Sequence, residues 1–252
     1  MCSTLRGKFA TVLNSTSHCI FENLAFEEFL FRTHNVLSHG EVLLTWSNTP
    51  SVVVGRHQNP WIEVNIPYAE KNGIKVFISD ALNSQYSLNI IPNKRDDMEL
   101  QPGNRKCSGT AARIARGQAY HHLTLLIDAN LSILSNSLKS PWQDQIETNS
   151  TRSVKAPAVG FVRQENPTVT VENSRKTIVE AYRTLFDDSR VENVDVAAKV
   201  RENPQISKIV EELKTWKWIY GKSPKFTYSD SNGNKVEVKD GLEVDSGKPF
   251  IL

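Results

Sequence analysis

The stretch GNRKCSGTAARIARGQAYHHLTLL, residues 103–126, decides how the rest of the chain is interpreted. A turn at 102–104 leads into two cations, Arg105 and Lys106, and a run of small residues follows at 108–112. An apolar run at 123–127 then predicts a strand that is preceded by two histidines. Cations beside a backbone left open by small side chains suit an anionic acyl or phosphate compound. The same pattern is typical of a surface hairpin with solvated charges, and the residues alone leave both interpretations open.

The composition is that of an ordinary globular protein. The 252 residues suffice for one large domain, or for one domain and part of a second. Hydrophobic residues make up 39% of the chain and charged residues 23%. The formal charge of +2 gives no reason to expect nucleic-acid binding, and no apolar run is long enough to span a membrane. The three cysteines have unrelated spacings, which fit a reducing compartment and neither a disulfide framework nor a zinc site.

The first residues have some features of a targeting segment. No acidic residue precedes Glu22, whereas basic and hydroxyl residues do. A strand is already predicted from Phe9, so only about eight residues remain for targeting. The sequence therefore indicates a weak transit signal.

Hydrophobic periodicity predicts helices interspersed with short strands. The expected strands are 8–13, 42–47, 51–54, 74–78, 123–127, 226–230 and 235–240, with hairpin turns at 48–50 and 231–234. The expected helices are 19–32, 64–72, 130–138, 171–185 and 206–216. Ser17 is the expected cap of the first helix. Residues 79–91 fit either a helix or a strand.

The usual catalytic signatures are missing, since the sequence has no G-x-S-x-G, H-E-x-x-H or C-x-x-C motif. Lys106 is a candidate because a lysine beside an acyl phosphate can hold the phosphate and stabilise charge during acyl transfer. Cys107 is a candidate thioester nucleophile because a neighbouring cation favours the thiolate. A buried structural cysteine is the more frequent alternative. His121 and His122 are consecutive residues at the start of the predicted strand, so they should point to opposite faces.

A second candidate binding segment is GRHQNPW at 55–61, which follows a predicted strand. Loops at strand ends commonly carry ligand-binding groups. The alternative is an ordinary turn in which Trp61 packs on the core. The convergence of several polar donors favours binding.

Several segments together resemble the lipoate–protein ligase A and lipoyltransferase family, most closely the animal mitochondrial lipoyltransferases. They are STSHCIFENLAFEEFLF at 15–31, TPSVVVGRHQNPWIEVN at 49–65, NKRDDM at 93–98, RKCSGTAARI at 105–114, AYHHLTLL at 119–126 and TRSVKAP at 151–157. TWKWIYGKSPKF at 215–226 resembles the family's link between its catalytic domain and a small C-terminal domain. The combination is specific, whereas each segment alone is not.

The resemblance implies an α/β (α+β) fold in which helices flank a mixed β-sheet, as in the biotin/lipoate ligase-like catalytic domain. It implies a catalytic domain at 9–218 and the start of a C-terminal accessory domain at 225–252. It also implies an acyltransferase that moves a lipoyl group from lipoyl-AMP to a lysine of apo lipoyl domains. The implied acceptors are the lipoyl domains of 2-oxoacid dehydrogenases and the glycine cleavage H protein. ATP and Mg²⁺ enter only if the chain also activates lipoate.

By the same resemblance the protein is a mitochondrial monomer, or otherwise a cytoplasmic one, with neither nucleic acid nor membrane as a partner. Lys106 stands at the family's essential lysine and is the implied catalytic residue. No metal ligand is implied. The residues implied to line the lipoyl-AMP pocket are Arg95, Lys106, Thr124, Val154 and Ala156, with Asp97 as a further one.

The chain departs from the family pattern after Val76. There the family carries an Arg-Arg-x-Ser-Gly-Gly-Gly segment, then a His-Asp and a Gly-Asn, which form much of the adenylate and lipoyl pocket. In this chain Phe77 follows directly and resembles later family material. We therefore expect an internal deletion near 76–77 and weak or absent activity.

Three alternatives accompany this reading. One is a catalytically dead, shortened variant that only binds lipoyl domains or the full-length protein. Another is an octanoyl transferase that uses Cys107 as a nucleophile. Biotin ligation on a related fold is less expected, because the sequence has no Gly-Arg-Gly-Arg-type loop.

Overall fold

The structure is a computed structural model that describes residues 7–51, 58–63, 88, 90–92, 98–115, 118–150, 156–221, 223–239 and 242–243. The chain separates into two compact units, each built from three segments of sequence. The first unit comprises Met1–Asn48, Phe77–Ala129 and Ala156–Ile209. The second comprises Thr49–Val76, Asn130–Lys155 and Val210–Leu252. The family-based domain limits, 9–218 and 225–252, stay a prediction.

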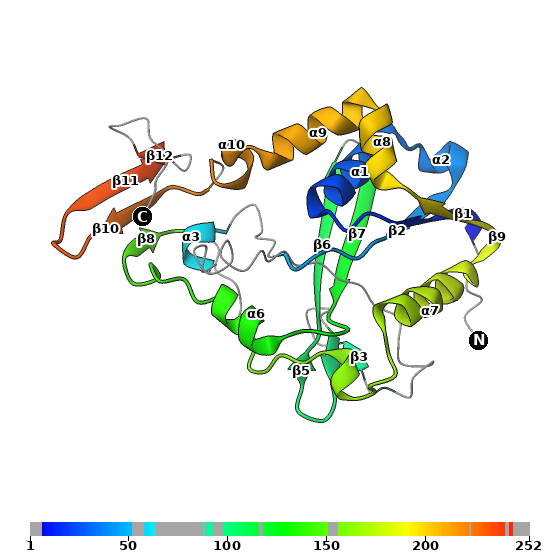
Figure 1. Ribbon diagram of the computed structural model, residues 1–252, viewed down its shortest axis with the longest axis horizontal. Coiled ribbons are helices and arrows are strands. Elements are labelled where there is room, and N and C mark those ends of the chain that lie inside the picture. Colours follow the sequence, from blue (N-terminus) through cyan, green and yellow to red (C-terminus); the bar gives the residue numbers. More distant parts are fainter. Residues whose placement is uncertain are drawn as a thin grey trace. The chain divides into compact units, whose positions relative to one another are not determined.

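A parallel three-stranded sheet lies in the first unit, with β1 between its two neighbours. Its strands are β1 (Gly7–Ser15), β2 (Glu41–Thr45) and β9 (Phe186–Val194). Parallel neighbours need a crossover connection, and α1 (Ile20–Thr33) and α2 (Val36–His39) connect β1 to β2 (Figure 1). Ala10 and Val12 of β1 are fully buried. The predicted strands at 8–13 and 42–47 are confirmed.

The first helix begins one residue later than predicted, at Ile20. Its N-cap is Cys19, which makes no side-chain cap hydrogen bond, so the prediction that Ser17 caps the helix is wrong. Ser17 Oγ instead accepts from the Cys19 N–H at 3.0 Å and donates to the Glu22 carboxylate at 2.5 Å. Ser17 thus stabilises the first turn from outside the helix.

The first unit also has antiparallel strands, and three of them lie within the stretch 103–126. One sheet consists of β3 (Ile90–Pro92), β4 (Met98–Leu100) and β5 (Arg105–Lys106), and a long hairpin consists of β6 (Ser108–Ala115) and β7 (Gln118–Leu125) (Figure 1). The small-residue run belongs to β6, where Ser108 lies opposite Leu125. These strands share one apolar core, formed by Ile90, Met98, Leu100, Cys107, Leu125, Ile127, Val162 and Val169.

The remaining helices described in the first unit are α7 (Val171–Arg183), α8 (Val196–Glu202) and the start of α9 (Pro204–Lys214). α7 confirms the prediction for 171–185, and its N-cap Thr170 accepts from the Asn173 N–H at 3.1 Å. α9 confirms the prediction for 206–216. β9 and α8 were not predicted from the sequence.

The second unit has its own antiparallel sheet, in the order β12-β11-β10-β8. Its elements are α3 (Pro60–Glu63), α6 (Leu131–Ser137), β8 (Ile146–Thr148), α10 (Trp216–Ile219), β10 (Phe226–Ser229), β11 (Lys235–Lys239) and β12 (Leu242–Glu243). Ile62, Ile146, Phe226 and Val238 form its buried core. The predicted helix at 130–138 and the hairpin at 226–240 are confirmed, and Gly233 has the positive φ of 85° that such turns favour.

Several predictions lie wholly or mostly outside the described residues: the strands 51–54 and 74–78 and the helix 64–72. Of the predicted loop 55–61, residues 58–61 are described, and Pro60 and Trp61 belong to α3 and not to a loop. Of the ambiguous 79–91, Ile90 and Ile91 belong to β3. Parallel and antiparallel sheets with flanking helices confirm the expected α/β (α+β) class.

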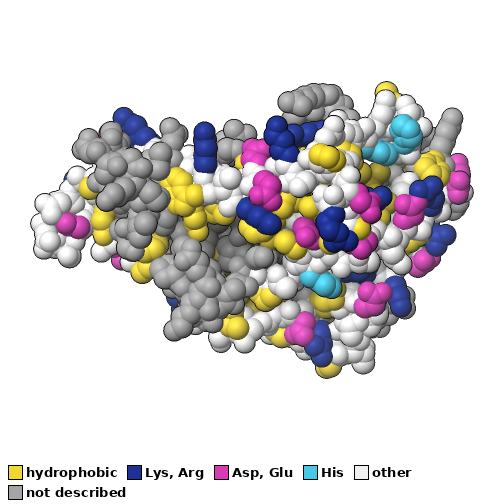
Figure 2. Space-filling view, turned by 45° about the horizontal axis from the view of Figure 1, so that its top comes forward, with side chains coloured by type: hydrophobic (Ala, Val, Ile, Leu, Met, Phe, Trp, Pro, Cys, Tyr) yellow, Lys and Arg dark blue, Asp and Glu magenta, His cyan; other side chains and the backbone are white. Residues whose placement is uncertain are grey.

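On the face that Figure 2 shows, the basic and acidic side chains of the described residues lie interspersed. This agrees with the small formal charge of +2. Within the part of the chain that the structure describes, no helix has the length and apolar character needed to cross a membrane.

Candidate functional site

Lys106 lies on β5, between β4 and the segment 158–160. On one edge Lys106 is opposite Glu99 of β4, and the N–H of the adjacent Cys107 donates to the Met98 carbonyl at 2.9 Å. On the other, its N–H donates to the Ala158 carbonyl at 3.0 Å, and its own carbonyl accepts from the Gly160 N–H at 3.0 Å. With the backbone fixed on two sides, mainly side-chain rotations remain to move the ammonium group. Such restraint is what a preorganised charged group requires.

Cys107 points to the other side of the chain from Lys106, because consecutive side chains of an extended segment face opposite ways. It is completely buried among Leu100, Val162 and their neighbours. Its thiol donates to the Met98 carbonyl at 3.5 Å. An acyl donor from solution cannot reach a thiol in this position. The structure therefore favours the structural role of Cys107 and speaks against the thioester hypothesis.

Thr124 lies directly opposite Gly109 in the β6–β7 hairpin. Its hydroxyl donates to the Gly109 carbonyl at 2.9 Å, so its two lone pairs remain as acceptors. The small residues after Lys106 were expected to leave backbone N–H groups open to an anion. Because these residues form β6, part of their N–H groups are used in pairing with β7. The small-residue run is therefore less open than the sequence suggests.

Backbone hydrogen bonds bring three predicted pocket residues, Lys106, Thr124 and Ala156, into one region of the first unit. Ala156 is two residues from Ala158, which is bonded to Lys106. Thr124 is two residues from Leu126, whose N–H donates to the Cys107 carbonyl at 2.8 Å. Lys106, Thr124 and Ala156 are all half-buried, so each side chain is anchored while part of it stays accessible.

The remaining predicted pocket residues, Arg95, Asp97 and Val154, lie outside the described residues, as do Arg56 and His57. Among the residues that the structure does describe, no group of three or more His, Cys, Asp or Glu side chains could hold a metal ion.

A charged cluster joins α1 to the hairpin that carries Thr124. Glu28 forms an ion pair with Arg113, and Glu27 lies 3.2 Å from Nδ1 of His122. Burial, reinforced by the negative charge of Glu27, raises the pKa of Tyr120 to about 12. Since His122 is half-buried in this cluster and the neighbouring His121 is exposed, the prediction of opposite faces is confirmed.

Sequence reasoning missed this cluster, because acidic residues on a helix usually form a solvated face. The available signal was the adjacent pair Glu27 and Glu28 in an otherwise largely apolar helix, together with the two histidines of the hairpin.

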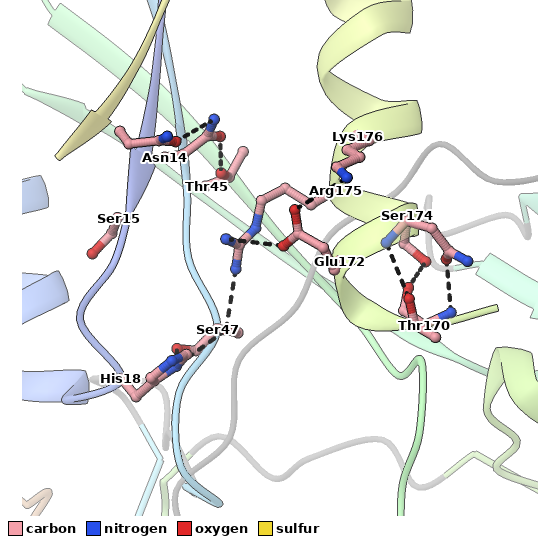
Figure 3. Close-up of polar contacts among 12 residues, drawn as sticks. Asn14, Ser15, His18, Thr45, Ser47, Thr170, Glu172, Ser174, Arg175 and Lys176 are labelled. Carbon is pink, nitrogen blue, oxygen red and sulfur yellow. Dashed lines mark hydrogen bonds and ion pairs between the residues drawn. The ribbon is translucent and has the colours of Figure 1, made fainter.

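A second polar network attaches α7 to the end of β2 (Figure 3). The Arg175 guanidinium donates to the Ser47 hydroxyl at 3.1 Å and lies 3.7 Å from the Glu172 carboxylate. His18 Nδ1 lies 2.9 Å from the Ser47 carbonyl. This network fixes the start of the segment that follows β2.

Comparison with known proteins identifies the family. The model of the lipoyl protein ligase A/B catalytic domain matches residues 19–81 and 77–183. The chain is 35% identical over 278 residues to the mitochondrial lipoyl amidotransferase LIPT1 of Mus musculus, covering 94% of this chain and 74% of that protein. It is 29% identical over 244 residues to lipoate-protein ligase A of Psychrobacter cryohalolentis, covering 82% of this chain and 70% of that protein.

Solved structures agree on the fold. LipL1 of P. falciparum, in a complex with lipoate, superposes with a TM-score of 0.67 at 22% identity and covers 93% of this chain and 82% of that one. A bipartite lipoate protein ligase of Thermoplasma acidophilum superposes with a TM-score of 0.59 at 17% identity, over 84% of this chain and 95% of that one. The matched domain, the 35% identity and the shared fold together show that the chain belongs to the lipoyl protein ligase A/B catalytic-domain family of acyl-transferring enzymes.

Proposed function

We propose that this chain transfers a lipoyl group from lipoyl-AMP to a lysine of an apo lipoyl domain. The observation that carries the proposal is the position of Lys106 in a chain of this family. Its backbone is held by Ala158 and Gly160, and its side chain faces away from the buried Cys107. Such a restrained cation, in the same region of the first unit as the half-buried Thr124 and Ala156, suits an acyl phosphate anion.

In the proposed reaction the amine of the acceptor lysine attacks the acyl carbon of lipoyl-AMP. The new amide bond forms as the bond between the acyl carbon and the phosphate oxygen breaks. AMP leaves with the electron pair of that bond, and the proton of the attacking amine passes to solvent. The positive charge of Lys106 stabilises the negative charge that develops on the carbonyl oxygen and the phosphate.

The relatives support finer assignments of acceptor and location. The LIPT1 proteins of mouse and human are mitochondrial lipoyl amidotransferases, and the T. acidophilum ligase was described with its E2 lipoyl domain. We therefore propose lipoyl domains of 2-oxoacid dehydrogenases and the glycine cleavage H protein as acceptors, and the mitochondrion as the compartment. We propose that the chain acts as a monomer, and that ATP and Mg²⁺ take part only where the chain also activates lipoate.

We further propose that the chain is an internally shortened member of its family. The two segments that match the family model overlap at residues 77–81, beside the proposed junction of Val76 and Phe77. The alignment with the mouse protein spans 278 positions, more than the 252 residues of this chain. The mouse protein therefore carries residues with no counterpart here. These two facts support a deletion near 76–77.

The deletion motivates a second candidate function, a variant that binds lipoyl domains or the full-length protein without chemistry. One experiment separates the two candidates. Purified chain is mixed with lipoyl-AMP and apo H protein, and mass spectrometry measures lipoylation of the H protein. If the chain lipoylates the H protein and Lys106→Ala abolishes this activity, the result supports the transferase. Lys176→Ala is the matched control, because Lys176 is an exposed lysine of α7 paired only loosely, at 3.9 Å, with Glu172.

Two other outcomes are informative. Turnover that survives Lys106→Ala excludes the proposed role of Lys106. Capture of the apo lipoyl domain, with no lipoylation and no heat of binding for lipoyl-AMP in calorimetry, supports the binding variant.

A further inference from the structure

Arg105, the residue before Lys106, connects β5 to the segment that contains Gln164 and Glu165. Arg105 Nη2 lies 2.6 Å from the Glu165 carboxylate, and Nη1 donates to Gln164 Oε1 at 3.4 Å. The side chains of Arg105 and Glu165 are 24% and 29% exposed, so solvent screens this pair less than an ion pair on the open surface. The guanidinium therefore engages two consecutive residues of one turn, a geometry that lysine cannot reproduce.

The turn that Arg105 contacts is anchored to the core. It is the 3₁₀ helix η1 (Val162–Gln164), which ends at Glu165. Val162 is fully buried, and its N–H donates to the Leu126 carbonyl at 2.8 Å. Gln164 Oε1 also accepts from the Phe161 N–H at 3.0 Å. Arg105 thus attaches β5 to a fixed support and not to a loose loop.

The two segments approach each other very closely at Gly160. A Cβ atom on Gly160 would lie 2.9 Å from Arg105 Cβ and 3.1 Å from Leu100 Cδ1. Real Cβ atoms essentially never come within 3.0 Å of another atom, so a side chain at Gly160 would force Arg105 to shift. The absence of a side chain at Gly160 is therefore what allows Gly160 to donate to the Lys106 carbonyl while Arg105 reaches Glu165.

From these contacts we infer that Arg105 is a positioning residue for Lys106, acting through Glu165 and through its close contact with Gly160. The inference rests on the proposed role of Lys106. Electrostatic stabilisation of a developing charge depends on a fixed distance, and a displacement of about 1 Å can cost on the order of a hundredfold in rate. Arg105 and Glu165 hold the strand edge that carries Lys106, and so they set where its ammonium group lies.

The test measures the environment of Lys106 directly, without requiring turnover. The intact chain is treated with a limiting amount of acetic anhydride, and mass spectrometry gives the acetylation rate of Lys106 relative to Lys176 in the same molecule. Arg105→Gln and Glu165→Gln remove the ion pair with little change in volume. We expect each to change the relative rate by about threefold or more, and to lower kcat about tenfold with an unchanged KM for the acceptor domain.

The controls use the same segment. Arg163 pairs with Asp128 from the neighbouring position of η1, with side chains 41% and 52% exposed. Arg163→Gln removes a similar ion pair away from Lys106 and is expected to leave both readouts unchanged. The charge-reversed double variant Arg105→Glu/Glu165→Arg restores opposite charges and is expected to recover much of both losses.

Each outcome decides one question. If Lys106 is acetylated at the wild-type relative rate in both Arg105→Gln and Glu165→Gln, the positioning inference is overturned, whatever the transferase activity of these variants. An equal effect of Arg163→Gln also overturns it, because the effect would then be general to η1. Turnover that survives Lys106→Ala overturns the proposed function instead, while the labelling rates still report on positioning.

Discussion

Thr124 and Gly109 face each other across the β6–β7 hairpin, and the threonine hydroxyl donates to the glycine carbonyl at 2.9 Å. A Cβ atom on Gly109 would lie 3.1 Å from that hydroxyl oxygen. A side-chain hydroxyl can move by a few tenths of an ångström, whereas the atoms around Gly160 cannot move so easily. The two glycines thus differ in how far their surroundings can yield.

This difference predicts graded effects of alanine on stability. We expect Gly160→Ala to lower the free energy of unfolding by about 1–3 kcal/mol, because Arg105 Cβ and Leu100 must move to make room. Gly109→Ala should cost less than about 1 kcal/mol. Urea denaturation of both variants measures the difference. Equal losses would show that the close approach at Gly160 relaxes without strain.

The core beneath Lys106 yields a second prediction. Val162 is fully buried, whereas Val159, three residues earlier in the same segment, is 37% exposed. Val162→Ala leaves a cavity and should lower the free energy of unfolding by about 2 kcal/mol. Val159→Ala, the matched control, should cost about 0.5 kcal/mol or less. The contrary finding, similar losses at both positions, would mean that the segment 158–165 does not rest on the core as described.

The burial of Cys107 yields a third prediction. Because Cys107 is completely buried and Cys19 is only partly so, iodoacetamide should modify Cys19 in the native protein and leave Cys107 unmodified. After unfolding in urea, both thiols should react. Peptide mass spectrometry distinguishes them. Native alkylation of Cys107 at a rate comparable to that of Cys19 would reopen the thioester hypothesis.

Local sequence patterns predicted the helices and strands that have a clear apolar period of their own. They missed those that form because of contacts with distant parts of the chain. β1, α1 and α7 each carry an apolar run or stripe of their own. β9 has the sequence FDDSRVENV, in which only Phe186 and Val194 are buried. It forms because β1 offers a complete strand edge for pairing, and no local pattern reveals a partner more than a hundred residues away.

The candidate site also has a part that the sequence predicts and a part that it does not. The residues and the family resemblance both predict Lys106 as the catalytic residue, and that role stays a prediction. The support of Lys106 was not predicted, because the contacts of Arg105 with Glu165 and of Lys106 with Ala158 join segments about fifty to sixty residues apart. The misjudged element was the small-residue run, whose backbone N–H groups were expected to be open to an anion. Its backbone pairs with β7, since small side chains leave the pairing of extended strands unhindered.

The α1–hairpin cluster yields the last prediction, a loss of stability in alkali. Burial, followed by the negative charge of Glu27, raises the pKa of Tyr120 from 10.0 to about 12. Between these two values the unfolded chain releases the phenolic proton while the folded chain keeps it. The unfolded state therefore binds fewer protons, and the free energy of unfolding falls as pH rises from 10 towards 12. Below pH 10 the contribution of Tyr120 is fully present.

The phenolate absorbance of Tyr120, taken as wild type minus Tyr120→Phe, should titrate in the folded protein with a midpoint near 12. Glu27→Gln removes a charge that disfavours the phenolate, so it should lower this midpoint while burial keeps it above 10.0. Tyr120→Phe should also flatten the dependence of unfolding free energy on pH between 10 and 12, with Tyr182 still contributing because its pKa is likewise raised to about 12. A midpoint near 10 in the folded wild type would mean that Tyr120 of the hairpin is not packed against α1.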